Sequence, residues 1–385
     1  MPLATQAIPP TFEQAATMLA GASAESRTVR IRGAGTKLGW GAPTPTPDIE
    51  LCTTGLNRIV EHNVGDLTAV LEAGVPLAEA QRTFAAAGQM LALDPPLSPG
   101  PGSPAAATIG GIAATGDSGP LRHRYGTPRD LIVGATVALS DGSIARSGGK
   151  VIKNVAGYDL AKLFAGSFGT LGVILSLSVR LHPLPLETTT VLAAADDPDL
   201  IGVAALSLAS SQLEFEALDV AWRAGRGGVL ARCAGREHAR RGRRAGRALS
   251  ALGVAHVEVT ADDGALWERQ RAGQRSEDRA LVRVAAPPSE LAAVLRAVDA
   301  CEGTLVGRAA LGSSYVELEP DAVAQLRSSL PMAHSATLLD APAALRSELD
   351  PWGPLEAPAL ELMRNVKARF DPTGTCNPGL FVGGI

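Results

Sequence analysis

The sequence predicts an α+β protein built from two domains, and three features of the 385-residue chain support this prediction. The length exceeds the roughly 100–200 residues of a typical single domain. Residues 100–181 are rich in glycine and show no sustained hydrophobic period until an apolar, strand-like run closes them. From about residue 187, glycine becomes sparse, and candidate strands and helices follow one another in β-α-β-β-α-β-like order, which is typical of a split βαβ domain. We therefore expect a glycine-rich domain over 1–186, a smaller α+β domain over 187–345, and a C-terminal helix and tail over 346–385.

The composition is that of a soluble globular protein. Hydrophobic residues make up 46% of the chain, charged residues make up 19%, and the formal net charge is -4. These values exclude a disordered chain and a protein that binds nucleic acid through a basic surface. The four cysteines are widely separated and form no Cys-x-x-Cys pair, so we expect reduced cytoplasmic thiols, no iron–sulfur cluster and no metal site. The sequence also has no signal-peptide pattern and no run of ~18 apolar residues, so we expect no segment that crosses a membrane.

Local signals mark several elements of the first 186 residues. Thr11 followed by Gln14 is typical of a capping box, and Pro76 and Gly88 bracket the helix that lies between them. An Asp141-Gly142 turn predicts a hairpin. The strands expected here are 28–32, 49–52, 59–62, 67–72, 90–93, 131–139, 143–145 and 171–181, and the helices are 12–19, 77–87, 108–115 and 157–164.

A Gly-x-Gly pair follows the first of these strands, at Gly33 and Gly35. A dinucleotide fingerprint requires a helix directly after the glycines, because the helix N-terminus holds the pyrophosphate. Four glycines and prolines between residues 41 and 47 leave no room for that helix, so we reject a Rossmann fold. The loop can still bind phosphate through successive backbone N–H groups, with charge from Arg32 or Lys37. An ordinary glycine turn remains the alternative.

The second half alternates regular elements and ends in a turn-rich tail. The tail, residues 371–379, combines Asp, Pro, Gly and Asn, which indicates a fixed loop with something held beside it. The expected strands are 188–193, 214–222, 228–233, 256–259, 280–285, 304–310, 314–318 and 336–339, and the expected helices are 199–210, 237–252, 266–271, 289–301, 321–329 and 360–370.

Five motifs in this order resemble those of the FAD-linked oxidases of the para-cresol methylhydroxylase and vanillyl-alcohol oxidase type, in particular a FAD-binding subunit of the glycolate oxidase complex. The motifs are the stretches 32–36; 108–113 with 118–120 and 124–126; 153–159; 166–172; and 371–372 with 377–379. They cover most of the first 181 residues and the tail. Over 187–345 the resemblance is architectural.

This resemblance implies a two-lobed FAD-binding domain of the para-cresol methylhydroxylase (PCMH) type followed by a smaller ferredoxin-like (split βαβ) cap domain. It also implies that the C-terminal helix and the Asn-Pro-Gly tail return to the FAD-binding domain. The loop 33–37 would lie on the pyrophosphate, residues 108–114 and 118–119 would line the flavin and pyrophosphate, residues 172–173 would lie near the adenine, and Asn377 would approach the isoalloxazine. The cofactor-binding residues that the resemblance implies are Arg32, Gly33, Ala34, Gly35, Thr36, Lys37, Pro95, Thr108, Gly110, Gly111, Ala113, Ala114, Ser118, Gly119, Gly172, Val173 and Asn377.

The chain departs from the family at two positions that affect its chemistry. Members that tether FAD covalently carry a histidine where Thr36 stands, so we expect non-covalent FAD. Relatives that oxidise a 2-hydroxy acid unaided carry a histidine-rich metal motif in the second domain, whereas the comparable stretch 301–318 has no histidine. No catalytic residue can be named firmly. Arg308 is a candidate clamp for a substrate carboxylate, with a surface arginine as the alternative, and His123 is a candidate base, with a solvent-facing loop histidine as the alternative.

We therefore expect the FAD-binding subunit of a glycolate (2-hydroxy acid) oxidase, cytoplasmic or peripheral at the inner face of the membrane through its partners. By resemblance, those partners are a homologous catalytic FAD subunit and an iron–sulfur subunit. Two alternatives stay open, a stand-alone FAD-dependent 2-hydroxy acid dehydrogenase and a non-catalytic assembly subunit with structural FAD. The segment 236–247 holds six arginines against one glutamate, and we expect either a solvated helix face or a docking face for an acidic partner.

Overall fold

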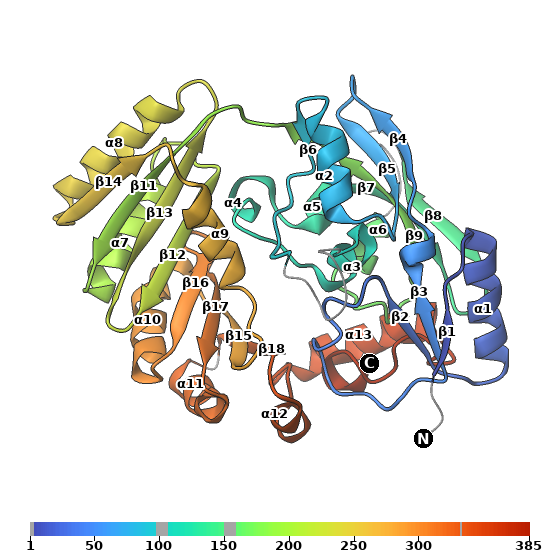
Figure 1. Cartoon of the computed structure of the whole chain (residues 1–385). Coiled ribbons are helices and arrows are strands. Elements are labelled where there is room, and N and C mark those ends of the chain that lie inside the picture. Colours follow the sequence, from blue (N-terminus) through green and yellow to red (C-terminus); the bar gives the residue numbers. More distant parts are fainter. Residues whose placement is uncertain (1–3, 98–106, 150–158, 332) are drawn as a thin grey trace.

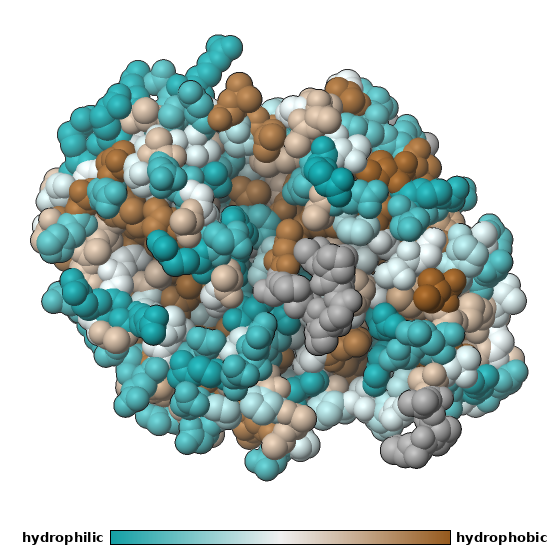
Figure 2. Space-filling model, viewed as in Figure 1, coloured by the Kyte–Doolittle hydropathy of each residue, from teal (hydrophilic) through white to brown (hydrophobic). Residues whose placement is uncertain are grey.

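The computed structural model describes residues 4–97, 107–149, 159–331 and 333–385, and it separates into two regions with sheets of their own (Figure 1). Hydrophilic residues predominate on the face shown in Figure 2, with hydrophobic ones scattered among them, as on typical globular proteins. No helix in the described ranges is both long enough and apolar enough to span a bilayer.

The N-terminal region contains two main sheets. The first is parallel, in the order β1 (Thr5–Ala7), β3 (Ile49–Cys52), β2 (Val29–Arg32). The second is antiparallel, in the order β4 (Ile59–Asn63), β5 (Thr68–Glu72), β9 (Val173–Arg180), β7 (Ile132–Ala138), β8 (Ile144–Gly148). β6 (Gln89–Met90) and β10 (His182–Pro183) form a short pair beside them. The helices are α1 (Phe12–Ala24), α2 (Leu77–Ala85), α3 (Ile109–Thr115), α4 (Arg122–Tyr125), α5 (Pro128–Leu131) and α6 (Ala161–Phe164).

Helix α1 joins the two N-terminal sheets through a shared apolar core. Its start is set as predicted, because the Thr11 hydroxyl accepts a hydrogen bond from the Gln14 N–H at 3.2 Å. Its buried Leu19 shares one cluster with Leu51 of β3 and Leu175 of β9. Burial of such side chains contributes roughly 1.5–3 kcal/mol each.

The C-terminal region is one eight-stranded antiparallel sheet made from two similar halves. The first half is β11 (Thr188–Ala195), α7 (Pro198–Ala209), β12 (Ala217–Arg223), β13 (Arg226–Ala234), α8 (His238–Ala251) and β14 (His256–Thr260). After α9 (Gly264–Ala272), the second half is β15 (Ala280–Ala285), α10 (Leu291–Ala300), β16 (Thr304–Arg308), β17 (Ser313–Leu318), α11 (Val323–Ser329) and β18 (Ser335–Asp340).

Each half has the β-α-β-β-α-β order of a ferredoxin-like unit, so the predicted fold class is confirmed. The strand order β14-β11-β13-β12-β16-β17-β15-β18 shows that the two units meet edge to edge through β12 and β16. The cap is therefore two such units fused into one sheet, which hides one edge of each unit from solvent.

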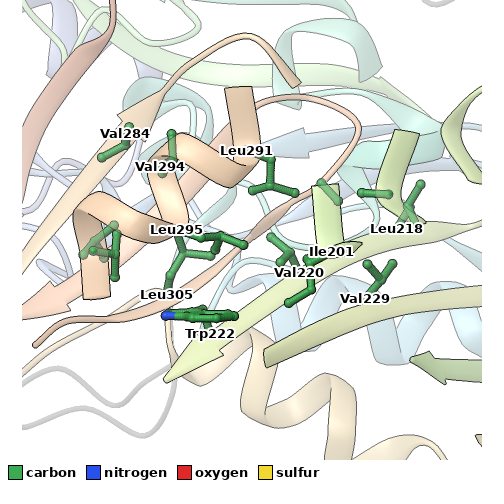
Figure 3. Close-up of a cluster of buried hydrophobic side chains, with 14 of the residues drawn as sticks. Ile201, Leu218, Val220, Trp222, Val229, Val284, Leu291, Val294, Leu295 and Leu305 are labelled. Carbon is green, nitrogen blue, oxygen red and sulfur yellow. The ribbon is translucent and has the colours of Figure 1, made fainter. Parts of the chain in front are cut away.

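The apolar core of this region lies on the helical side of the sheet (Figure 3). There, Val220 and Trp222 of β12 pack with Leu295 of α10. Because side chains alternate along a strand, Asp219 of β12 lies on the opposite face, which is turned toward the N-terminal region. Helix α4 occupies the space between the regions and packs near β12.

The C-terminal segment returns to the first region. After α12 (Ala343–Glu348) and α13 (Ala357–Phe370), the Val29 N–H donates to the Thr375 carbonyl at 2.8 Å, and the Asn377 N–H donates to the Val29 carbonyl at 2.9 Å. The tail thereby continues the parallel sheet beside β2.

The structure differs from the sequence prediction mainly in short elements. β1, β10, α4, α5 and α12 were not expected, because segments of two to six residues carry no readable hydrophobic period. The expected strand 90–93 is reduced to β6. Pro76, expected at the first helical position, is instead the N-cap of α2. Of the expected helix 157–164 only α6 is seen, and residues 153–158 of the motif at 153–159 lie outside the described residues.

Candidate cofactor site

A cavity of about 580 Å³ lies in the N-terminal region, within the usual size range of small-molecule sites. Its walls come from the loop after β2, the start of α3, the glycine cluster before β9 and the tail. The predicted cofactor residues that line it are Arg32, Gly33, Ala34, Gly35, Thr36, Lys37, Thr108, Gly110, Gly111, Ala114, Gly172 and Asn377. The other five predicted residues, Pro95, Ala113, Ser118, Gly119 and Val173, are not among the lining residues.

The loop after β2 presents backbone donors to this cavity. The N–H groups of residues 34–37 have no acceptor in the part of the chain that the structure describes. Residues 34–37 are partly exposed and line the cavity, so a run of free donors there fits a bound group rich in oxygen atoms. This arrangement suits the diphosphate of a dinucleotide.

The glycines of this site permit a close approach between segments. A Cβ on Gly33 would lie 2.1 Å from the Thr108 hydroxyl oxygen, which is an impossible contact. That hydroxyl caps α3 by accepting a hydrogen bond from the Gly111 N–H at 3.2 Å. A Cβ on Gly110 would lie 2.6 Å from Ala73. Glycine at these positions therefore lets α3 pack closely against the loop after β2 and against Ala73, the residue after β5, so that backbone forms the cavity wall.

The two cations expected to hold phosphate are already paired. Lys37 Nζ lies 3.0 Å from the carboxylate of Asp117, and both side chains are buried. Arg32 Nε donates to Glu50 at 3.2 Å. A cation that the sequence analysis missed, Arg346 of α12, also lines the cavity, and no carboxylate within 4 Å of it is found in the described chain.

Arg346 donates to the Gly41 carbonyl at 2.9 Å, and partial burial lowers its pKa. Without a carboxylate partner, it can give its charge to an anion in the cavity. It stands on a six-residue helix with no motif around it, so no sequence signal could have identified it. Trp40, Phe168 and Leu380 also line the cavity and were not predicted.

Gly119 and Ser118 do not line the cavity, but they pack beside the segment that carries Asp117. A Cβ on Gly119 would lie 1.8 Å from the Asp94 carbonyl oxygen, so the glycine is needed for packing. The Asp94 carboxylate accepts a hydrogen bond from the Leu121 N–H at 2.9 Å. The Ser118 hydroxyl is buried and has no hydrogen-bond partner in the described residues. These residues fix the path of the segment that carries Asp117.

Asn377 lines the cavity, but its amide is used by the protein. Its Oδ1 accepts from the Ile31 N–H at 2.8 Å, and its Nδ2 donates to the Phe168 carbonyl at 2.7 Å. It adopts the left-handed conformation, with φ 42°, that asparagine tolerates better than most residues. The side chain therefore joins the tail, β2 and the glycine cluster at residues 166–172 into one wall.

The two candidate catalytic residues lie outside this cavity. Arg308 is 1% exposed and forms an ion pair with the buried Asp219, so the surface-arginine alternative is wrong. Burial lowers the pKa of His123, with Arg124 adding to the effect, and its Nδ1 is buried without a partner in the described chain. The lowered pKa favours the neutral imidazole, and the side chain as a whole is half-buried.

Two carboxyl groups between the regions titrate near neutrality. Burial raises the pKa of Asp94 to about 7, and burial likewise raises the pKa of Asp219 to about 7. Their protonated forms are favoured in the folded protein but not in the unfolded chain, whose aspartates titrate near ~3.9. These two groups therefore contribute a loss of native-state stability as the pH rises from about 4 through 7.

The substitution Asp94→Asn should reduce this loss, because the amide keeps the acceptor for Leu121 and does not titrate. We expect the unfolding temperature to fall less in the variant than in the wild type between pH 4.5 and 7.5, as measured by thermal unfolding. The exposed Asp196→Asn is the control. An equal fall in Asp94→Asn and wild type would contradict the assignment.

Metal ligands do not gather within the described ranges, where no three His, Cys, Asp or Glu side chains are placed to hold an ion. The four cysteines are free and buried.

Comparisons with known proteins agree with this geometry. Residues 5–148 match the family described as FAD binding domain. The glycolate oxidase subunit GlcD of Bacillus subtilis is 36% identical over 168 residues, which are 44% of this chain and 34% of that protein. Glycolate oxidase subunit GlcE of Escherichia coli is 36% identical over 156 residues, 40% of this chain and 42% of that protein. A D-lactate dehydrogenase of Archaeoglobus fulgidus is 37% identical over 185 residues, 48% of this chain and 40% of that protein.

The match covers less than half the length of each of these three relatives. Over the whole fold, a solved structure of alkyldihydroxyacetonephosphate synthase superposes with a TM-score of 0.69 at 13% identity, and covers 97% of this chain and 76% of its own. The expected resemblance to FAD-linked oxidases and the expected cofactor, FAD, are thereby confirmed. Residues 5–148 of this chain match the FAD binding domain family, and the chain as a whole shares its fold with alkyldihydroxyacetonephosphate synthase.

Proposed function

We propose that this chain is the FAD-binding subunit of a 2-hydroxy acid oxidase complex of the glycolate oxidase kind. The observation that supports it best is the cavity, which both ends of the chain build around free backbone N–H groups inside a FAD binding domain. The similarity to GlcD and GlcE supports the substrate class and a complex of several subunits. The partners in this proposal are a homologous flavin subunit and an iron–sulfur subunit, at the cytoplasmic side of a membrane.

The residues assigned to the cofactor act by holding and positioning it. The N–H groups of residues 34–37 would donate to its diphosphate, and Arg346 would add positive charge. Gly110, Gly111 and Gly172 would let backbone approach the rings. When bound, FAD accepts the two electrons released by oxidation of a C–H bond. Neutral His123 is the proposed acceptor of the hydroxyl proton, since its Nδ1 is free in the described structure.

Non-covalent binding of FAD is part of this proposal, because Thr36 carries no nucleophilic nitrogen to form a tether. We expect acid precipitation of the purified protein to release all yellow cofactor into the supernatant, where its absorbance can be measured. Flavin that stays with the precipitated protein would show a covalent link and contradict this part of the proposal.

Catalysis should depend on the partner subunits, because the stretch 301–318 lacks the histidines that would bind a metal and lower the pKa of the substrate hydroxyl. A lone base contributes only ~10²–10⁴-fold. We expect the FAD-loaded single chain to show a glycolate turnover, coupled to a dye, far below that of the coexpressed complex. Equal rates would favour a stand-alone dehydrogenase. If the flavin of this subunit is never reduced while the assembled complex turns over, this result would favour a non-catalytic assembly subunit.

A further inference from the structure

We propose that the arginine-rich face of α8 binds the phosphate headgroups of an anionic lipid surface. This face goes beyond the proposed oxidase function and does not depend on it, because α8 belongs to the cap and none of its residues lines the cofactor cavity. Its five exposed arginines are named here the α8 arginine stripe: Arg236, Arg240, Arg243, Arg244 and Arg247.

The spacing of these arginines places them on one side of the helix. Residues that are three, four or seven positions apart along a helix are neighbours on its surface, and the arginines from Arg240 to Arg247 are spaced in this way. The segment 236–247 holds six arginines and one glutamate, so its net charge is +5 in a chain whose formal net charge is -4. Positive charge is therefore concentrated on this side of the cap.

Most of this charge has no acidic partner within the protein. Arg240 lies 3.3 Å from Glu237 in an exposed ion pair. Glu258 of the neighbouring strand β14 alternates with Val257 and Val259, which lie against α8, so its side chain is on the opposite face of the sheet. In the part of the chain that the structure describes, no hydrogen bond or ion pair is made by the side chains of Arg236, Arg243, Arg244 and Arg247.

The stripe destabilises the helix that carries it. Cations three or four residues apart repel one another, as Arg243 and Arg247 do. Arg240 stands in the first turn, where the positive end of the helix dipole disfavours a cation, and the last turn carries no basic residue. An arrangement that local energetics disfavours is expected where function requires it. Phosphate groups bound along the stripe would relieve this repulsion.

The helix holds the stripe outward in a fixed position. A Cβ on Gly242 would lie 2.7 Å from the side chain of Thr189 on β11, so α8 is packed closely on the sheet. Its buried Ala245 and Leu249 belong to the apolar core of the cap. The arginines on the other side of α8 therefore face solvent, on the side of the cap that is turned away from the N-terminal region (Figure 1).

The chemistry of the stripe fits a lipid surface better than a protein partner. The centre of a protein interface is usually apolar and rich in aromatic residues. No large hydrophobic side chain is exposed within the segment 236–247. A layer of anionic headgroups, by contrast, attracts a cluster of basic residues through charge alone and needs no complementary shape. Guanidinium groups also match phosphate oxygens with two parallel hydrogen bonds.

These features predict reversible binding that salt weakens. The apolar face of α8 is already packed on the sheet, so the helix has no apolar face to insert among the acyl chains. Attraction between exposed charges is screened over ~8 Å at physiological ionic strength. Because the whole chain is negatively charged, binding to an anionic surface requires the local charge of the stripe.

The test is sedimentation of the purified full chain with two kinds of vesicle, pure phosphatidylcholine and phosphatidylcholine with about 30% phosphatidylglycerol. At about 0.05 M salt we expect binding to the anionic vesicles and none to the neutral ones, and at about 0.5 M salt we expect at least tenfold weaker binding. Neither FAD nor oxidase activity enters this measurement, so its failure would leave the proposed function untouched.

The double variant Arg243→Gln/Arg244→Gln should bind anionic vesicles about tenfold more weakly or less still, since each basic residue near such a surface adds roughly fivefold. It should unfold at or above the wild-type temperature, because it removes like-charge pairs. The matched control, Arg82→Gln/Arg180→Gln, removes two exposed arginines from the N-terminal region and should bind like the wild type.

Three results would overturn the proposal. The first is equal binding of the wild type to neutral and anionic vesicles, or binding to neither. The second is an equal loss of binding in the control, which would assign the attraction to overall charge. The third is wild-type binding in the Arg243→Gln/Arg244→Gln variant. If poly-glutamate bound the chain where anionic vesicles did not, the stripe would be a docking face for an acidic protein instead.

Discussion

The substitution Gly35→Val is expected to abolish FAD retention by the purified chain. Gly35 has φ +80°, a conformation that β-branched residues almost never adopt. Valine would force the loop after β2 into another path and turn away the free N–H groups of residues 34–37. Flavin absorbance relative to protein absorbance after gel filtration measures the effect, and we expect the ratio to fall to near zero.

A matched substitution separates this local effect from general destabilisation. Gly225, in the turn between β12 and β13, has φ +72° and open space around it. Gly225→Val therefore imposes a similar backbone strain, on the order of 1–3 kcal/mol, far from the cavity. We expect this variant to fold and to keep its flavin. Full flavin occupancy in Gly35→Val would show that the loop does not hold the cofactor.

Much of the fold could be predicted because the apolar residues of long strands and helices recur with a recognisable spacing in the sequence. β11 to β18 and their helices were all expected, since apolar residues recur at the spacing of strands and helices. The pairing of β12 with β16 could not be predicted, because nothing in either strand specifies its neighbour. That pairing decides that Asp219 meets Arg308, and so it buries an arginine for which the sequence left a surface position open.

The sequence carries a signal for the backbone that lines the cavity, but it carries none for the partners of the charged side chains there. The glycines near residues 33–35 and 110–111 are visible in the sequence because only glycine permits such close contacts. The pairing of Lys37 with Asp117, and the lack of a carboxylate partner for Arg346 in the described chain, depend on which distant segments meet. Spacing along the chain carries no information on such contacts, so the sequence could not show that Lys37 and Arg32 have carboxylate partners.

The substitution Lys367→Met, at the end of α13, is expected to lower both the free energy of unfolding and the affinity for FAD by a large amount. The ammonium group of Lys367 donates to the Thr170 carbonyl at 2.7 Å, to the Cys376 carbonyl at 2.8 Å and to the Asp371 carboxylate at 2.6 Å. The Asp371 side chain is fully buried, and its carboxylate also accepts from the Cys376 N–H at 2.8 Å. Lys367 thus ties α13, the tail and the glycine cluster before β9 together.

Methionine at position 367 would leave the Asp371 carboxylate buried without a cation. Removal of one partner of a buried ion pair typically costs about 3–5 kcal/mol. We expect a loss of this size in the free energy of unfolding, measured with urea, and weaker FAD binding, because the tail carries Asn377 on the cavity wall.

The control for this change is Lys162→Met, which removes a lysine from a solvent-exposed pair with Asp159. Exposed pairs contribute about 0–1 kcal/mol, so this variant should unfold near the wild-type urea concentration and keep its flavin. If Lys367→Met matched the Lys162→Met variant in both stability and FAD affinity, the tail could not be the part of the chain that closes the cavity. A loss of stability with unchanged FAD affinity would restrict the role of Lys367 to folding and leave the cofactor to the loop after β2 and to α3.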